Sequence, residues 1–181
     1  MIKLLVTGAN GLLGQKLISL SASLQEISFI ATGRGENRNP PGKYEYRQLD
    51  VTSREEVSTV LKEINPDVVI NCAAMTHVDQ CETHQEACWS QNVRALEYLI
   101  ASCIEANAFL IQLSTDFIFD GLAGPYTEEA VAHPLSYYGK SKLASEDLLK
   151  SSPVKSAIVR TVLVYGIAHD MSKSNIILWV K

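Results

Sequence analysis

Short apolar runs alternate with amphipathic stretches from the first residues of the chain onward. The apolar runs have the length of strands, and the stretches between them repeat apolar residues at helical spacing, as the leucines between residues 13 and 24 do. This alternation is typical of consecutive βαβ units. Strands are predicted at Ile2–Thr7, Ser28–Thr32, Tyr44–Val51, Asp67–Ala74, Phe109–Thr115 and Ala157–Val164.

Helices are predicted between these strands. The first covers Gly11–Leu24. The second follows a capping box formed by Ser53 and Glu56 and stops before Pro66. A long helical region runs through about 80–107, and another helix covers about 138–150. Six strands joined by right-handed helical crossovers predict an α/β fold, a Rossmann-like doubly wound parallel sheet with helices on both faces. The expected strand order is 3-2-1-4-5-6.

Composition narrows the class of protein. The 181 residues are 46% hydrophobic and 20% charged, with a net charge of −4 and no block of Lys or Arg. Neither nucleic acid nor a membrane surface is therefore an expected partner. Apolar runs stay well short of the ~20 residues that span a bilayer. The apolar run in MIKLLVTGAN is too short for a signal peptide and is interpreted as a first strand, so a cytoplasmic location is expected.

The four cysteines form no CxxC pair, but two of them share a predicted helical face with two histidines. The residues of this group are His77, Cys81, His84 and Cys88. At 1.5 Å of rise per residue, the outer two lie about 16 Å apart on a straight helix. Four side chains spread along one helix cannot close on one ion with tetrahedral geometry. No metal site is predicted.

The first predicted strand ends in the sequence TGANGLLG, which opens a helix. Gly8, Gly11 and Gly14 form a GxxGxxG pattern. The first glycine permits a tight turn, the second lets backbone approach a pyrophosphate, and the third lets helix and strand pack closely. The amides and the positive dipole end of the helix then face the phosphates. This motif, placed between a strand and a helix, predicts a dinucleotide site.

The end of the second predicted strand indicates which dinucleotide binds. An acidic residue there would bind the ribose 2′-hydroxyl, but the sequence is ATGRG, with Arg34 at this place. A guanidinium suits a 2′-phosphate, which favours NADPH and leaves NADH as the alternative. The other interpretation is that Arg34 is a solvated surface residue.

A tyrosine and a lysine four residues apart mark the start of the last predicted helix. In HPLSYYGKSK, Tyr138 and Lys142 share a helical face, whereas Tyr137 has a serine at that spacing. An ammonium on the next turn favours the phenolate and lowers the tyrosine pKa, so that Tyr138 can act as a general acid towards a carbonyl oxygen. Thr115, at the carboxyl end of the fifth strand, is predicted as a second donor to that carbonyl.

These motifs resemble the extended short-chain dehydrogenase/reductase superfamily and, within it, the dTDP-4-dehydrorhamnose reductase family. The resemblance covers residues 5–166. It is carried by TGANGLLG, LDVTS, INCAAMTHVDQCE, the Asn92–Val93 pair, LSTDFIFDG followed by PYTEE, YGKSKLASE and VRTVLVYG.

The resemblance implies roles for further residues. It makes Thr115, Tyr138 and Lys142 the catalytic trio, with Lys142 also binding the nicotinamide ribose. It places near the cofactor Asn10, Leu12, Asp50, Val51, Ala73 and Ala74, and it places near the nicotinamide and the substrate Thr76 and Asp116. Phe117 stands on the substrate side where the family usually has tyrosine, which removes a hydroxyl group and puts rhamnose-type specificity in question.

The function implied is reduction of a 4-keto nucleotide-sugar by NADPH or NADH, with dTDP-L-rhamnose as the expected product. Two alternatives remain open: a non-catalytic, cofactor-binding regulatory subunit like the methionine adenosyltransferase beta subunit, and another nucleotide-sugar reductase or epimerase. Residues 1–166 are expected to form the NAD(P)-binding Rossmann domain. Residues 167–181 are expected to start a substrate-binding part that is largely missing. The sequence leaves a homodimer open.

Overall fold

The computed structural model describes residues 1–170 and contains one parallel sheet of six strands in the order β3-β2-β1-β4-β5-β6. The predicted fold class and strand order are therefore confirmed. The strands are β1 (Ile2–Thr7), β2 (Ile27–Gly33), β3 (Tyr44–Gln48), β4 (Val68–Asn71), β5 (Phe109–Thr115) and β6 (Ser156–Thr161). Of the expected substrate-binding part at 167–181, residues 171–181 lie outside the described residues.

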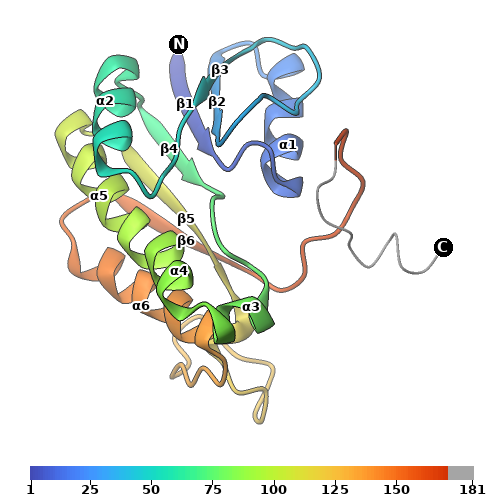
Figure 1. The fold of residues 1–181 in the computed structure, drawn as a ribbon, viewed down its shortest axis with the longest axis vertical. Helices are drawn as coiled ribbons and strands as arrows, with labels where there is room; N and C mark the ends of the chain where they lie inside the picture. The colour runs from blue at the N-terminus through green and yellow to red at the C-terminus, as the bar shows by residue number, and fades with distance from the viewer. Residues whose placement is uncertain (171–181) are drawn as a thin grey trace.

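The helices lie on both faces of the sheet, but unequally (Figure 1). One face carries α2, α5 and α6, and the other carries α1 over the strands at the N-terminal end of the chain. No helix within residues 1–170 is long and apolar enough to cross a membrane. The helices are α1 (Leu12–Ser19), α2 (Arg54–Ile64), α3 (Val78–Thr83), α4 (Gln85–Trp89), α5 (Ala95–Ala106) and α6 (Tyr137–Ser151), with short turns η1 (Leu20–Ala22), η2 (Ser90–Arg94) and η3 (Asp116–Ile118).

Alternating side chains of the central strands feed two separate cores. In β1, Leu5 packs into the large core under α2, α5 and α6, whereas Val6 packs into the smaller core under α1. In β2, Ile30 faces the large core and Phe29 the small one. Both faces of these strands are buried, which explains why their sequences are almost continuously apolar.

Several strands end earlier than the sequence predicts because their neighbours end. β4 stops at Asn71, which is paired with Thr7 at the end of β1, and β6 stops at Thr161, which is paired with Thr115 at the end of β5. β3 ends at Gln48 because the next apolar residue, Leu49, turns into the large core. The staggered carboxyl ends leave side chains and loops free to form a site at one edge of the sheet.

The predicted long helix at 80–107 is interrupted. His84 adopts φ −126° and ψ 57°, which separates α3 from α4, and the π-helical turn η2 joins α4 to α5. The π-helical turn brings the side chain of Asn92 inward, where it is 3% exposed. Such turns inside helices frequently occur at functional sites.

The start of α2 differs from the predicted capping box in one bond. The Ser53 hydroxyl accepts a hydrogen bond from the Glu56 amide, as predicted. The Glu56 carboxylate, however, accepts from the amide of Asp50 rather than from that of Ser53. The Ser53 amide is already bound to the Asp50 carbonyl, so the glutamate reaches back to the loop before the helix.

Candidate functional site

The glycine loop between β1 and α1 has the close contacts that its sequence predicts. Gly8 has φ +63°, and a Cβ there would lie 2.8 Å from the amide nitrogen of Ala73. A Cβ on Gly14 would lie 2.4 Å from the Gly8 carbonyl oxygen, so only glycine lets α1 pack on this turn. The exposed Gly11 begins α1 with no side chain capping it. The first amides of α1 therefore face outward without a side-chain acceptor, which suits a pyrophosphate group.

Asn10, which was expected near the cofactor, forms hydrogen bonds with the segment that follows β2. Its side-chain amide donates to the carbonyls of Arg34 and Glu36 at 3.3 and 2.9 Å and to the Tyr46 hydroxyl at 3.2 Å. Its side-chain oxygen accepts from the amide of Arg38 at 3.0 Å. Asn10 thereby fixes the loop that carries two exposed arginines, Arg34 and Arg38, beside the glycine loop.

The remaining residues expected near the cofactor lie around the same edge of the sheet. The Asp50 carboxylate accepts hydrogen bonds from the amide and the hydroxyl of Thr52, and Val51 is buried in the large core. Leu12 is the first residue of α1. The loop after β4 holds Ala73, Ala74 and the exposed Thr76.

Tyr138, Thr115 and Phe117 come together where α6 meets the end of β5. Tyr138 is 9% exposed, and its ring stands edge-on to that of Phe117, with centroids 5.8 Å apart. Burial raises the pKa of Tyr138 to about 12, and hydrogen bonding with the Thr115 side chain acts in the opposite direction. The phenol is thus held in its protonated form. The neighbouring Tyr137 packs in the adjoining apolar cluster, and its amide donates to the Glu82 carboxylate.

Lys142 lies on the same helical face but does not lower the pKa of Tyr138, so that expectation was wrong for this state. The lysine is 3% exposed, and its ammonium donates to the Leu113 carbonyl at 2.6 Å. Burial lowers its own pKa to about 8. Desolvation of both side chains outweighs the attraction that helical spacing alone suggested.

Asn92 connects the π-helical turn to the loop after β4 and to α6. Its side-chain oxygen accepts from the Met75 amide at 2.8 Å, and its side-chain nitrogen donates to the Met75 carbonyl at 3.1 Å and to the Ser141 hydroxyl at 2.9 Å. The sequence offered Asn92 only as part of a motif. A polar residue among apolar positions of a helix was the one available signal of its burial.

A chain of buried hydrogen bonds crosses the sheet from the glycine loop to Lys142, and sequence reasoning missed it. The Thr7 hydroxyl donates to the Asn71 side chain at 2.6 Å, and Asn71 donates to the Gln112 side chain at 2.8 Å. Gln112 donates at 3.0 Å to the carbonyl of Leu113, the group that also binds Lys142. Only the strand register reveals that these residues are neighbours.

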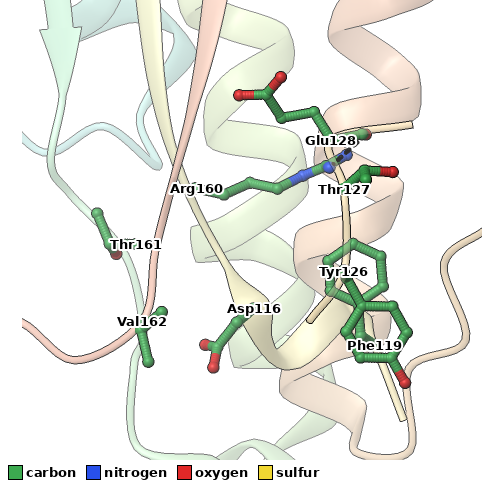
Figure 2. Close-up of a pocket in the computed structure, with 8 residues that line it drawn as sticks. All are labelled: Asp116, Phe119, Tyr126, Thr127, Glu128, Arg160, Thr161 and Val162. Carbon is green, nitrogen blue, oxygen red and sulfur yellow. Dashed lines mark hydrogen bonds between the residues drawn. The ribbon is translucent and has the colours of Figure 1, made fainter. Parts of the chain in front are cut away.

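A pocket of about 300 Å³ adjoins Asp116, on the side of β5 that faces β6 (Figure 2). The rings of Phe119 and Tyr126 are stacked with centroids 4.4 Å apart, and the Arg160 guanidinium lies 5.5 Å from the Phe119 centroid. The pocket is lined by Asp116, Phe119, Tyr126, Thr127, Glu128, Arg160, Thr161 and Val162. Of the residues expected near the substrate, Asp116 lines this pocket, and Phe117 is 45% exposed beside Tyr138.

The His/Cys group weighed as a metal site does not lie on one helix. His77 caps the start of α3 and His84 separates α3 from α4, while Cys81 and Cys88 point into the apolar cluster that includes Tyr138. Cys72 is half-buried, and Cys81, Cys88 and Cys103 are buried. Among residues 1–170, no group of three or more His, Cys, Asp or Glu side chains is arranged to hold a metal ion.

Comparisons with known proteins agree on one family. The model of the RmlD substrate binding domain family matches residues 2–177. The dTDP-4-dehydrorhamnose reductase of Aggregatibacter actinomycetemcomitans is 36% identical over 167 residues, which are 92% of this chain and 53% of the relative. The methionine adenosyltransferase 2 subunit beta of Rattus norvegicus is 32% identical over 174 residues, 96% of this chain and 50% of the relative.

A solved structure shows the same similarity. The dTDP-4-dehydrorhamnose reductase of Bacillus anthracis, determined in complex with NADP, superposes with a TM-score of 0.76 at 31% identity, over 91% of this chain and 55% of that one. The chain thus spans about half the length of the relatives it matches.

Proposed function

The chain belongs to the RmlD substrate binding domain family, and from that premise we propose that it is the cofactor-binding portion of an NAD(P)H-dependent reductase acting on a 4-keto nucleotide-sugar. The expected substrate is dTDP-4-dehydrorhamnose. The observation that carries the proposal is the contact between the side chains of Tyr138 on α6 and Thr115 at the end of β5. Lys142 lies one helical turn further along α6 and binds the Leu113 carbonyl of β5.

Each of these side chains has a task in such a reaction. A bound nicotinamide cofactor supplies the hydride. Tyr138, held protonated by burial, gives its proton to the carbonyl oxygen as the oxygen gains negative charge. Thr115 supplies a second hydrogen bond to that oxygen. Lys142, released from the Leu113 carbonyl, binds the nicotinamide ribose and stabilises the phenolate that Tyr138 becomes.

NADPH is the proposed cofactor. The exposed Arg34 lies just after β2, in the loop that Asn10 fixes beside the start of α1. In this place its guanidinium can pair with a 2′-phosphate. The relative from Bacillus anthracis was solved with NADP, in agreement with this choice.

Residues 1–166 are proposed as the cofactor domain, with residues from 167 onward leading into a substrate-binding part. On this proposal the 181-residue chain binds NADPH, but binds and reduces a sugar nucleotide weakly, because remote contacts supply much of the energy that positions a substrate. Calorimetric titration with NADPH, and then with a dTDP-sugar, tests it. Tight sugar-nucleotide binding with efficient turnover by this chain would contradict the division.

A regulatory subunit is the second candidate, because the similarity to methionine adenosyltransferase subunits extends over 96% of the chain. One experiment distinguishes a reductase from a regulatory subunit. Protein purified from its own cell is mixed with NADPH and a panel of 4-keto sugar nucleotides, and loss of NADPH is followed. A reductase consumes NADPH with at least one of these sugars. No turnover on any of them, together with stoichiometric recovery of an adenosyltransferase, would favour the subunit.

A further inference from the structure

Glu146 is a fully buried carboxylate one helical turn beyond Lys142. Its side chain is 0% exposed. One carboxylate oxygen accepts from the Ser114 hydroxyl at 2.6 Å and from Arg160 Nε at 2.9 Å, and the other accepts from Arg160 Nη2 at 2.7 Å and from Lys150 Nζ at 3.2 Å. Burial alone would raise the pKa of Glu146, but every partner of its carboxylate is a hydrogen-bond donor, and these bonds lower that pKa to about 2.

The partners of Glu146 belong to the strands that build the site. Ser114 immediately precedes Thr115 at the end of β5, and Arg160 immediately precedes Thr161 at the end of β6. Arg160 also reaches across the pocket to donate to the Glu128 carbonyl at 2.7 Å (Figure 2). A single carboxylate on α6 thus ties that helix to both strands.

We infer that Glu146 is a positioning residue of this site: its carboxylate fixes the face of α6 that carries Tyr138 and Lys142 against Ser114 and Arg160, and it places a buried negative charge one helical turn from Lys142. This inference rests on the proposed function, because it assigns Glu146 a role toward the residues that the reaction requires. It also makes a claim about Lys142 that is measurable without cofactor or substrate.

Among the groups around Lys142, Glu146 is the anion that raises the Lys142 pKa most strongly. Glu146, Cys72 and Cys88 all favour the charged lysine, with Glu146 the strongest of the three, while burial opposes the charge. The Cys72 thiol is neutral, because burial raises its pKa to about 12.

The elements packed against α6 carry one cation, Arg94 of η2, and six further carboxylates, which are Asp79, Glu82, Glu86, Glu97, Glu105 and Asp116. Asp116 of η3 acts on Tyr138, Glu82 of α3 is bound to the Tyr137 amide, and Glu86 of α4 is paired with Arg94. None of these carboxylates is among the groups that shift the Lys142 pKa.

A purely structural role for Glu146 predicts a different pattern. A buried ion pair is weak evidence for stability, and replacing both partners often costs little. If Glu146 only clamped Arg160, removing both members together would restore the protein. If it also charges Lys142, the lysine titration stays altered even when folding is restored.

The test is an NMR titration of the 181-residue chain carrying ¹³C at lysine Cε, with the Lys142 signal assigned from Lys142→Arg. In the wild type we expect a midpoint at about pH 8. Glu146→Gln should move it about one pH unit lower, the low end of the effect of a nearby opposite charge. Arg160→Gln should move it higher, because the Glu146 charge is then no longer shared with the guanidinium.

Two further variants separate the outcomes. The double variant Glu146→Gln/Arg160→Gln removes the ion pair and should still lower the midpoint, but by less than Glu146→Gln, because a cation is removed together with the anion. It replaces Glu146→Gln if that single variant fails to fold. Lys150→Gln, at the exposed partner, should leave the midpoint nearly in place. An unchanged Lys142 midpoint in the folded double variant overturns the inference. Failure of the wild type to bind NADPH, measured separately, would overturn the proposed function instead.

Discussion

Gly139 is the position where one added methyl group should most directly disturb the proposed catalytic helix. It follows Tyr138 in the first turn of α6, and a Cβ there would lie 2.3 Å from the Phe117 carbonyl oxygen and 3.0 Å from Pro134 Cβ. The backbone carbonyl cannot rotate away, so α6 and the Phe117 segment must separate by about 0.7 Å to reach even a tight contact of 3.0 Å.

The cost of Gly139→Ala follows from this overlap. Overpacking of a closed contact typically costs about 1–3 kcal/mol. For a chain of this size, 1 kcal/mol corresponds to about 2–4 °C in Tm, so we expect Tm to fall by about 2–12 °C. The same displacement moves Tyr138 relative to Thr115, and a misplacement near 1 Å can cost about 10²-fold in rate.

The assay is thermal unfolding followed by circular dichroism. NADPH turnover is measured for the same substitution in full-length protein that carries the proposed substrate-binding part. Lys140→Ala is the matched control, because Lys140 is exposed in the same turn of α6 and the change should leave Tm nearly unchanged. If Gly139→Ala melted with the wild type, the reasoning that α6 packs rigidly on the Phe117 carbonyl would be refuted.

Three further predictions concern the cofactor, acid stability and the buried hydrogen-bond chain. Arg34→Ala should weaken NADPH binding roughly ten- to a hundredfold, which corresponds to a charge-assisted contact of about 1.5–3 kcal/mol, and should leave NADH binding unchanged. Arg38→Ala is the control variant. Equal affinities of the wild type for NADPH and NADH would refute the assignment of Arg34 to the 2′-phosphate. Because the Glu146 pKa is about 2 instead of 4.5, the free energy of unfolding should fall as the pH drops from about 4.5 towards 2. The Glu146→Gln variant should lack this part of the decline. Denaturant titrations at several pH values measure both effects. Gln112→Leu should lower the free energy of unfolding by about 1–3 kcal/mol in urea titration, because it leaves the buried Asn71 donor without its acceptor; an unchanged midpoint would mean that the chain of bonds contributes nothing to folding.

The sequence predicted the sheet because its apolar runs and helical patterns are local. All six strands and their order follow from runs such as Ile2–Thr7 and Phe109–Thr115, whose bounds agree with the structure at both ends. Other strands were predicted too long, because the point where a strand ends depends on the neighbouring strand. β4, for example, stops at Asn71, which pairs with Thr7 at the end of β1. The break at His84 was missed because the helical pattern continues across it.

The sequence suggested residues for the candidate site but could not specify the electrostatics around them. The order of the glycine loop, Thr115 and the Tyr138–Lys142 pair is visible in the chain. The burial that raises the Tyr138 pKa and turns Lys142 to the Leu113 carbonyl arises from packing between distant segments. The contact of Glu146 with Arg160 likewise depends on how α6 crosses β6, which no local pattern specifies.

The central claim is that Tyr138, and not its neighbour Tyr137, donates the proton in a reductase reaction. The direct measurement is the initial rate of NADPH oxidation with a 4-keto nucleotide-sugar, made on full-length protein that carries the proposed substrate-binding part and compared between Tyr138→Phe and Tyr137→Phe. We predict that Tyr138→Phe loses about 10²–10⁴-fold in kcat, the usual worth of a positioned general acid, with NADPH affinity nearly intact, and that Tyr137→Phe stays close to the wild type. Wild-type turnover by Tyr138→Phe, with the loss appearing in Tyr137→Phe, would contradict the account.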